Sequence, residues 1–262
     1  MSIFLLLLIN ISFSQDKKEI TKLKNYSFYL LKSYHTDKNW SIKYKLLNGL
    51  VQEEENFRND NLASIQKNIY DKKNNKIESY LIFKNMHNDN KMDTLSANFF
   101  KYDNKNRLIE LKHVLRFSIT KLTDDATTFE IYSDFDKQSN AKTISRYDQN
   151  RKPVYKENRE FDNKGNLVKE VKTELEKSQN NESAKIINTE TCNYKYDKYN
   201  NVIELKRSFD PKKVFPIAKL DGLTIYETEN YEYEYNEIGL WLKKYVIIEG
   251  KKRLIEERSF SK

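Results

Sequence analysis

Apolar and polar residues alternate along much of this chain with a period of two positions. From Ile109 to Ile119, apolar residues and His113 occupy the odd positions, and charged or polar residues occupy most of the even ones. Residues 192–196 and 231–235 show the same alternation, with tyrosines separated by asparagine, lysine or glutamate. Strands that bury one face and leave the other in water have this pattern. The sequence therefore predicts a mainly β protein made of antiparallel strands.

A short turn motif recurs between the alternating segments. It consists of an aromatic residue, then Asp or Asn, then two variable residues, and finally Gly or Asn. Complete copies begin at Tyr70, Tyr102, Phe161, Tyr196 and Tyr235. Two weaker copies, which lack the final Gly or Asn, begin at Phe135 and Tyr147.

Each position of the motif has a physical reason. The Asp or Asn side chain can accept a hydrogen bond from the backbone N–H two residues later. Gly or Asn tolerates the positive φ that closes a short hairpin loop, and the aromatic residue ends the incoming strand on its buried face. Each copy predicts a hairpin, and the series predicts a β-meander. We expect a curved single sheet, or an open barrel or sandwich, because a flat sheet would expose a large apolar patch.

Three segments depart from the alternation. Residues 177–185 are polar and predict a loop, and residues 210–221, with Pro211 and Pro216, predict a longer connection. Residues 23–31 have apolar spacing that fits a helix and also a strand, so a short N-terminal helix remains an alternative. Nothing else divides residues 15–262, which we expect to form one domain.

The only long apolar run lies at the start of the chain, from Ile3 to Ile11. It is too short to span a bilayer, and the small residues Ser12 and Ser14 are typical of a signal-peptide cleavage site. We expect a signal peptide over residues 1–14, although no Lys or Arg precedes the apolar run. The expected location is periplasmic, associated with the outer membrane, or secreted. No Cys lies near the junction, so a lipid anchor is not expected.

The net charge of +8 comes from 47 basic and 39 acidic residues, but it does not predict nucleic-acid binding. Lysines are scattered among glutamates, as in Glu170, Lys172 and Glu174, and form no basic stripe. A nucleic-acid interface needs clustered cations. The single Cys excludes a disulfide scaffold and a multi-cysteine metal site.

The sequence contains no recognisable catalytic, metal or cofactor motif. His35, His87 and His113 have no second ligand at a suitable spacing, and the apolar position of His113 predicts a packed core histidine. Cys192 shares its face with tyrosines, which predicts a buried and unreactive thiol. We expect no cofactor.

Acidic residues are numerous, and two alternatives for them stay open. The runs at residues 53–55 and 124–125 predict solvated surface, but a hydrolase that uses two carboxylates remains the second candidate function. The Asp residues of the motif could bind calcium, although their turn role explains them without a metal. These residues are Asp71, Asp103, Asp162 and Asp197.

Six aromatic residues are the candidate binding residues. Rings supply contact area at a low entropic cost, and they could stack on sugars or contact a protein. The alternative is that they only form the core of the sheet. They are Tyr194, Tyr196, Tyr231, Tyr233, Tyr235 and Trp241.

The repeated turns resemble the YD repeats of the RHS family, and more closely the short exported YD-repeat-like proteins of Bacteroidetes-type bacteria. The resemblance covers about residues 60–260. It rests on Tyr70-Asp71, Tyr102-Asp103, Phe161-Asp162, Tyr196-Asp197 and Tyr235-Asn236. It implies a β-hairpin meander and, by analogy of fold, a carbohydrate or cell-surface interaction.

We therefore expect an exported, non-catalytic binding or interaction protein whose partner is a protein or glycan at the cell envelope. Besides the hydrolase, an immunity-type or structural envelope protein is a further alternative.

Overall fold

The computed structural model describes residues 17–34, 40–84, 92–115, 126–176, 185–218 and 224–262. One helix, α1 (Lys17–Leu23), and eighteen strands lie in this part of the chain. The strands are β1 (Phe28–Ser33), β2 (Trp40–Leu47), β3 (Leu50–Arg58), β4 (Asn61–Tyr70), β5 (Lys76–Lys84), β6 (Met92–Tyr102), β7 (Leu108–Leu115), β8 (Ala126–Phe135), β9 (Ala141–Tyr147), β10 (Pro153–Phe161), β11 (Leu167–Leu175), β12 (Ile186–Tyr196), β13 (Val202–Asp210), β14 (Ile217–Ala218), β15 (Thr224–Ile225), β16 (Thr228–Tyr235), β17 (Trp241–Ile248) and β18 (Lys251–Ser261).

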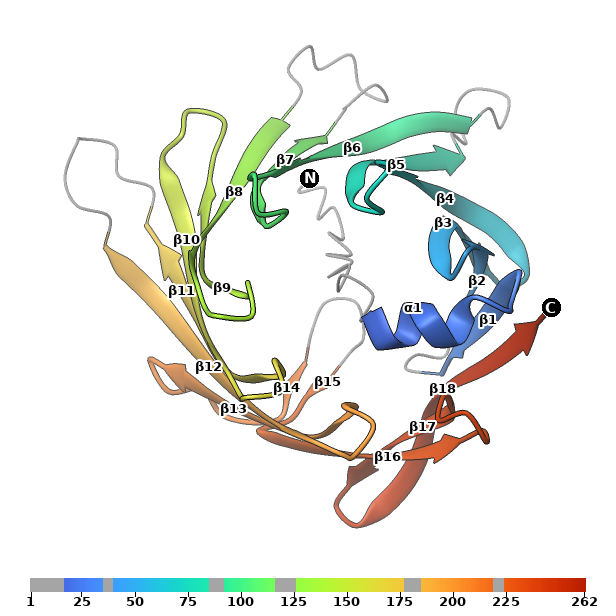
Figure 1. The fold of residues 1–262 in the computed structure, drawn as a ribbon. Helices are drawn as coiled ribbons and strands as arrows, with labels where there is room; N and C mark the ends of the chain where they lie inside the picture. Colours follow the sequence, from blue (N-terminus) through green and yellow to red (C-terminus); the bar gives the residue numbers. More distant parts are fainter. Residues whose placement is uncertain (1–16, 35–39, 85–91, 116–125, 177–184, 219–223) are drawn as a thin grey trace.

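Sixteen of these strands form one closed antiparallel barrel (Figure 1). Each strand pairs with its neighbours in the chain, and β1 closes the wall by pairing with both β2 and β18. The small strands β14 and β15 form a separate two-stranded sheet in the connection from β13 to β16. The predicted antiparallel meander is confirmed. The sheet closes completely, which removes the edges that an open barrel or sandwich would have left.

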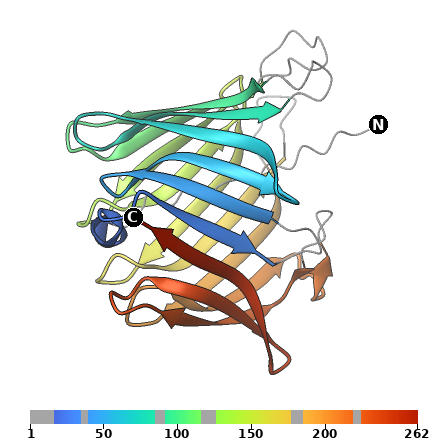
Figure 2. The ribbon, with the colours of Figure 1, turned by 90° about the vertical axis from the view of Figure 1, so that its right-hand side faces the viewer.

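The N-terminal segment contains both a helix and a strand. α1 ends at Leu23 and β1 begins at Phe28. The helix lies inside the barrel near one end (Figures 1 and 2), where Leu23 is fully buried against Tyr29 and Leu240. This contact identifies the inner face of the wall, because Tyr29 points toward a helix that the barrel surrounds.

The strand registers identify the residues that lie on this inner face in the other strands. Residues directly opposite each other on antiparallel strands share a face. From Tyr29, the inner face therefore passes to Tyr44, then to Glu54 and Gln66. The residues between them along each strand face outward.

All seven copies of the motif form the same five-residue turn. The Asp or Asn donates its backbone N–H to the carbonyl four residues later, and the residue three positions later donates its N–H back. That residue has a positive φ in every copy: Asn74 (65°), Asn106 (64°), Ser139 (70°), Arg151 (59°), Gly165 (85°), Asn200 (67°) and Gly239 (73°). The copies at Phe135 and Tyr147, which lack the expected Gly or Asn, therefore make the same turn with Ser139 and Arg151.

The Asp side chain completes the turn. In the copy at Phe161, Asp162 Oδ1 accepts backbone N–H bonds from Lys164 and Asn166, each at 2.8 Å. Asp162 Oδ2 accepts the side-chain amide of Asn166 at 2.9 Å. The structure therefore adds a position to the motif, an Asn directly after the residue of positive φ. The same bond recurs at Asn75 and Asn140.

In the copies at Tyr70, Tyr102 and Tyr196, the motif tyrosine attaches its hairpin to the preceding one. The hydroxyl of Tyr70 donates to the carbonyl of Val51 at 2.8 Å, and the hydroxyl of Tyr102 donates to that of Lys76 at 2.9 Å. At these strand ends the backbones of the two hairpins are not paired. The tyrosine hydroxyl therefore supplies a hydrogen bond between the hairpins where the backbone makes none.

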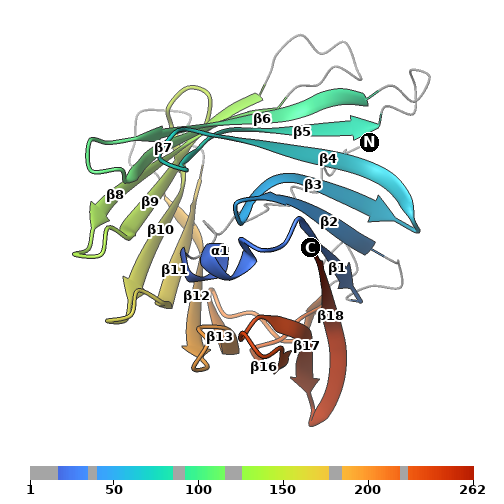
Figure 3. The ribbon, with the colours of Figure 1, turned by 45° about the vertical axis from the view of Figure 1, so that its right-hand side comes forward.

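Six of the seven motif turns lie at one end of the barrel, which we call the turn end, because they join each even-numbered strand to the next. α1 lies at this end too (Figure 3). Neighbouring turns touch: the side-chain amides of Asn75 and Asn106 bond to each other at 2.7 and 2.9 Å. The opposite end, with the longer connections, we call the loop end.

Candidate functional site

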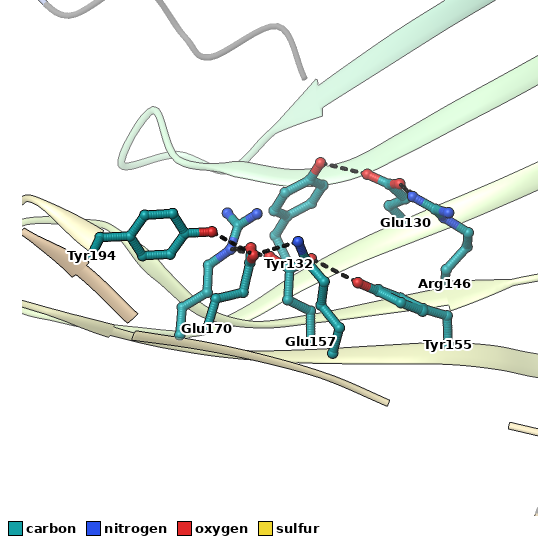
Figure 4. Close-up of polar contacts among 9 residues, drawn as sticks. Glu130, Tyr132, Arg146, Tyr155, Glu157, Glu170 and Tyr194 are labelled. Carbon is teal, nitrogen blue, oxygen red and sulfur yellow. Dashed lines mark hydrogen bonds and ion pairs between the residues drawn. The ribbon is translucent and has the colours of Figure 1, made fainter. Parts of the chain in front are cut away.

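The inner wall of the barrel is polar where β8 to β12 pass. Ser33 on β1 pairs with Glu256, and Glu256 with Lys244. The registers then continue the inner face around the wall to Tyr194 and Glu170. Figure 4 shows the side chains gathered there, with hydrogen bonds and ion pairs between them.

Four charged residues on β10 and β11 form the centre of this wall, and we call them the quartet: Glu157, Arg159, Glu170 and Lys172. Lys172 Nζ lies 2.5 Å from Glu170 Oε2. Arg159 Nε lies 3.6 Å from Glu170 Oε1 and also bonds to Glu157. The glutamate side chains are 9% and 6% exposed, whereas those of Arg159 and Lys172 keep 26% and 25% of their surface. The two carboxylates are thus buried within the wall, whereas the two cationic side chains stay partly exposed toward the barrel interior.

Tyrosine hydroxyls complete the coordination of the carboxylates. Tyr194 donates to Glu170 Oε2 at 3.1 Å, and Tyr155 donates to Glu157 Oε2 at 3.3 Å. Beside the quartet, Glu130 accepts the hydroxyl of Tyr132 at 2.8 Å. Glu130 also accepts two hydrogen bonds from Arg146, at 3.0 and 2.5 Å.

The two quartet carboxyls titrate differently. Burial, together with the hydrogen bond to Glu170, raises the pKa of Glu157 to about 7. For Glu170, burial acts in the same direction, but the hydrogen bond from Glu157 and the charge of Lys172 outweigh it and hold the pKa below its usual value. The two carboxyls therefore titrate as a pair, in which protonation of Glu157 is favoured over protonation of Glu170.

A second cluster of charged residues lies at the short pairing between β13 and β16. β13 and β16 pair over only three positions, Glu204–Lys206 with Thr228–Asn230. Arg207 bridges this seam: its guanidinium lies 2.6 Å from Glu229 on β16 and 3.8 Å from Glu190 on β12. It also donates to the carbonyl of Tyr226 at 3.3 Å. One partly buried cation thus ties three strands together.

All six predicted aromatic residues lie on the inner face, and they fall into three groups. Tyr194 and Tyr231 donate to carboxylates of the polar wall. The hydroxyls of Tyr196 and Tyr233 bond to backbone carbonyls of the preceding hairpin. Near the turn end, Tyr235 bonds to Asp197, and Trp241 packs 6.1 Å from the ring of Tyr233 and 3.8 Å from the guanidinium of Arg258. Their role in binding stays a prediction.

The structure also places the cysteine, one histidine and the Asp residues that the sequence singled out. Cys192 is buried, as predicted, and burial raises the pKa of its thiol to about 11. His113 Nδ1 lies 2.6 Å from Asn98 Oδ1, and burial lowers the pKa of its ring. The four predicted Asp residues serve the turns. His35, His87 and residues 124–125 lie outside the described residues, as does the expected signal peptide at 1–14.

The prediction that residues 53–55 form solvated surface is wrong at Glu54. Glu53 and Glu55 face outward and pair with Lys45 at 2.5 and 2.8 Å. Glu54 alternates to the inner face, where it accepts a hydrogen bond from Gln66 at 3.2 Å, and burial raises its pKa.

The carboxylates of the polar wall, Glu130, Glu157 and Glu170, were not predicted as functional residues from the sequence. A signal was present, because β10 and β11 carry charged residues at both odd and even positions. A strand of a closed sheet must turn one face inward, so a strand with no apolar face places charges inside.

The outer face of the barrel also carries charged residues, in cross-strand ion pairs. Besides those of Lys45, Lys195 lies 2.9 Å from Glu204, and Lys252 lies 2.7 Å from Glu232. Separately, no helix in the described ranges is long and apolar enough to cross a membrane.

Comparison with known proteins gives a fold and no family. A scan against protein-family models finds no match, and a search of curated proteins finds no relative. The chain is similar in structure to a porin-like protein from Bacteroides uniformis, with a TM-score of 0.51 and 8% sequence identity over 91% of this chain and 97% of that one. This likeness supports the barrel fold alone.

A weaker match is to TcdB2-TccC3, with a TM-score of 0.32 and 12% identity over 85% of this chain and 13% of that one. The chain therefore corresponds in length to about an eighth of that protein. No conclusion is drawn from this match, and membership of a YD-repeat family stays a prediction.

Proposed function

We propose that this chain is an exported, non-enzymatic protein of the cell envelope that binds a glycan inside its barrel. The observation that carries the proposal is the inner wall, where cations, carboxylates and tyrosine hydroxyls are held together in a fixed network. A barrel of 16 strands encloses more space than its side chains fill. The partly exposed side chains of Arg159 and Lys172 agree with such a space.

The chemistry of this wall suits a sugar. Hydroxyl groups need donors and acceptors placed close together, and the wall supplies guanidinium, ammonium and carboxylate groups within a few ångströms. Tyr233 and Trp241 lie on the same inner face, and rings of this kind can stack on the apolar face of a sugar. Because the side chains are already bonded to one another, little order has to be gained on binding.

The charged residues of the outer face favour a barrel that is surrounded by water and not by lipid. A Lys or Arg at the lipid-facing middle of a membrane barrel costs about 2–4 kcal/mol. Ion pairs such as Lys67–Glu53 and Lys45–Glu55, which lie away from the ends of their strands, would place several such charges in lipid. The barrel shape that it shares with the porin-like protein does not require a bilayer, and we place this chain in the periplasm or outside the cell.

The same geometry favours binding over hydrolysis. Glycosidases that use two carboxylates hold them about 5–9.5 Å apart. Glu157 and Glu170 bond directly to each other, which leaves no room for a sugar or a water between them. Both are also occupied by cations and tyrosines.

The proposal is tested with the full chain, expressed with its N-terminus intact and recovered from the cell envelope. Isothermal titration calorimetry against a panel of neutral and acidic oligosaccharides should give binding to at least one. Flotation with lipid vesicles should leave the protein at the bottom of the gradient. Binding to no sugar in the panel, or cleavage of one that binds, would overturn the proposed function; flotation with the vesicles would overturn the placement in water.

A further inference from the structure

The hydrogen bonds of the polar wall leave an excess of donors. Glu170 is already bonded by Lys172, Tyr194 and Glu157, and Glu157 by Arg159 and Tyr155. The acceptors at this place are therefore largely used.

The donors are used only in part. Within the described part of the chain, Arg159 bonds through Nε, and its two terminal nitrogens make no hydrogen bond. Lys172 has three N–H groups, and its one ion pair with a described residue is that with Glu170. On β9, Arg146 binds Glu130 through Nε and Nη2, and Nη1 makes no bond to a described residue.

These donors lie on three adjacent strands and face the interior. Arg146 and Tyr155 are directly paired across β9 and β10, and Arg159 and Glu170 across β10 and β11. Their side chains remain a quarter to a third exposed, so the N–H groups that the wall does not use are directed to the space inside the barrel. A ligand that fits must supply acceptor oxygens.

We propose that this part of the wall, Arg146, Arg159 and Lys172, binds the carboxylate of an acidic glycan, such as one built of uronic acid units. This inference rests on the proposed function and specifies which class of glycan the barrel binds. A guanidinium presents parallel N–H groups that match the two oxygens of a carboxylate, whereas a neutral sugar hydroxyl would use one donor at a time. The tyrosines beside the cations offer contact to the sugar ring.

The charge of the site changes with pH through Glu157. The groups that face it are Tyr155 and Arg159 on β10, Glu170 and Lys172 on β11, and Tyr132 on β8 with Arg146 on β9 nearby. With both glutamates ionised the quartet is neutral, and with Glu157 protonated it carries one positive charge. Because the pKa of Glu157 is raised to about 7, an anionic ligand should bind more tightly at pH 6 than at pH 8.

The test uses a matched pair of probes, tri-galacturonate and the neutral 1,4-linked galactotriose, titrated calorimetrically into the full-length protein. We expect tri-galacturonate to bind at least tenfold more tightly than galactotriose at pH 6. The variants R159Q and K172Q should each lose at least tenfold of the affinity for tri-galacturonate. The controls are K156Q and K169Q, which remove a cation from the outward face of the same strands and should keep the affinity within twofold.

The variant E157Q separates a binding role from a folding role, because it imitates the protonated form without removing a donor. It should bind tri-galacturonate at pH 8 as tightly as the unchanged protein does at pH 6, and its affinity should no longer depend on pH. Equal affinity for the two probes, or R159Q and K172Q that fold and bind unchanged, would overturn this inference and leave the proposed function standing. Binding of neither probe, nor of any other sugar in the panel, would overturn both.

Discussion

The turns at the end of the barrel and the quartet in its wall are both networks around a carboxylate, but they are built over different distances in the chain. In the turn at Asp162, every partner of the carboxylate lies within four residues. In the quartet, the partners of Glu170 come from three strands, and Tyr194 is 24 residues away. The turn can form on its own, whereas the quartet with Tyr194 exists only when β10, β11 and β12 are paired in register.

This difference has energetic consequences. The Asp162 carboxylate lies near solvent, so water can replace a lost partner. The Glu170 side chain is only 6% exposed. Water cannot reach it to replace a lost partner, so the loss leaves a buried charge without compensation. We expect changes in the quartet to cost more than changes in a turn, and to affect several strands at once.

The largest effect should follow removal of one quartet carboxylate. The substitution Glu170→Ala leaves Lys172 and Tyr194 without their partner inside the wall, and breaking a buried pair in this way costs about 3–5 kcal/mol. Urea unfolding followed by circular dichroism measures the loss. The matched control is Glu160→Ala, which removes the outer-face partner of Lys169, 3.0 Å away, and should change stability by about 0.5 kcal/mol or less. Equal losses in the two variants would show that the wall is as well hydrated as the surface.

The second prediction concerns pH. A carboxyl whose pKa is raised on folding binds its proton more tightly in the native state, so its contribution is complete below the unfolded value and is lost as pH rises through about 7. For Glu157 the loss between pH 5 and 8 is about 3 kcal/mol at most. His113, whose pKa is lowered, acts in the opposite direction near pH 6.

The contribution of Glu157 is isolated by comparing the unchanged protein with Glu157→Gln across this range. The variant should lose most of the downward slope in its unfolding free energy and keep the rise from His113. Parallel curves for the two proteins would mean that Glu157 is ionised throughout.

The same contrast explains what the sequence could predict. The turns were predictable because the Asp and the residue of positive φ are three positions apart, and only specific side chains suit each place. Even so, Ser139 and Arg151 show that the turn tolerates residues that the motif does not predict. Closure of the sheet was not predictable, because it depends on the pairing of β1 with the distant β18. The polar wall was not predictable, because it depends on the register that places particular residues of neighbouring strands opposite each other. Nothing near Glu170 in the chain points to Tyr194.

A smaller effect is expected at the turns. The substitution Asp162→Ala removes the acceptor for two backbone N–H groups and one amide, a loss of about 2 kcal/mol. The neighbouring Lys164→Ala removes an exposed side chain and should leave the unfolding midpoint unchanged. Hydrogen exchange should show faster opening of β10 and β11 near the turn in Asp162→Ala and no change in the distant β2. Uniform weakening of all strands would contradict the local nature of the turn.

The hydroxyl that joins neighbouring hairpins should contribute less. The substitution Tyr102→Phe leaves the ring in place and removes one hydrogen bond to the carbonyl of Lys76, which costs about 1 kcal/mol. The control is Tyr245→Phe on the outer face, whose hydroxyl bonds to the exposed Glu234 and should contribute little. If the two variants lost equal stability in thermal denaturation, the hydroxyl of Tyr102 would not be acting as a ladder bond.

The smallest effect is a gain in stability, and it tests whether the residue of positive φ is fitted to its turn or only tolerated. Ser139 adopts a φ of 70° and donates its backbone N–H to Asp136 at 3.1 Å. A side chain costs about 1–2 kcal/mol in this left-handed conformation, and glycine avoids that cost but loses more chain entropy on folding. Ser139→Gly should therefore stabilise the protein by about 0.5 kcal/mol, a small rise in melting temperature. The reverse change, Gly165→Ser, should destabilise it, because Gly165 has a φ of 85°, which strains any residue with a side chain. A loss of stability in Ser139→Gly would mean that the serine side chain itself holds this turn together, and that the seven copies are less alike than their backbones are.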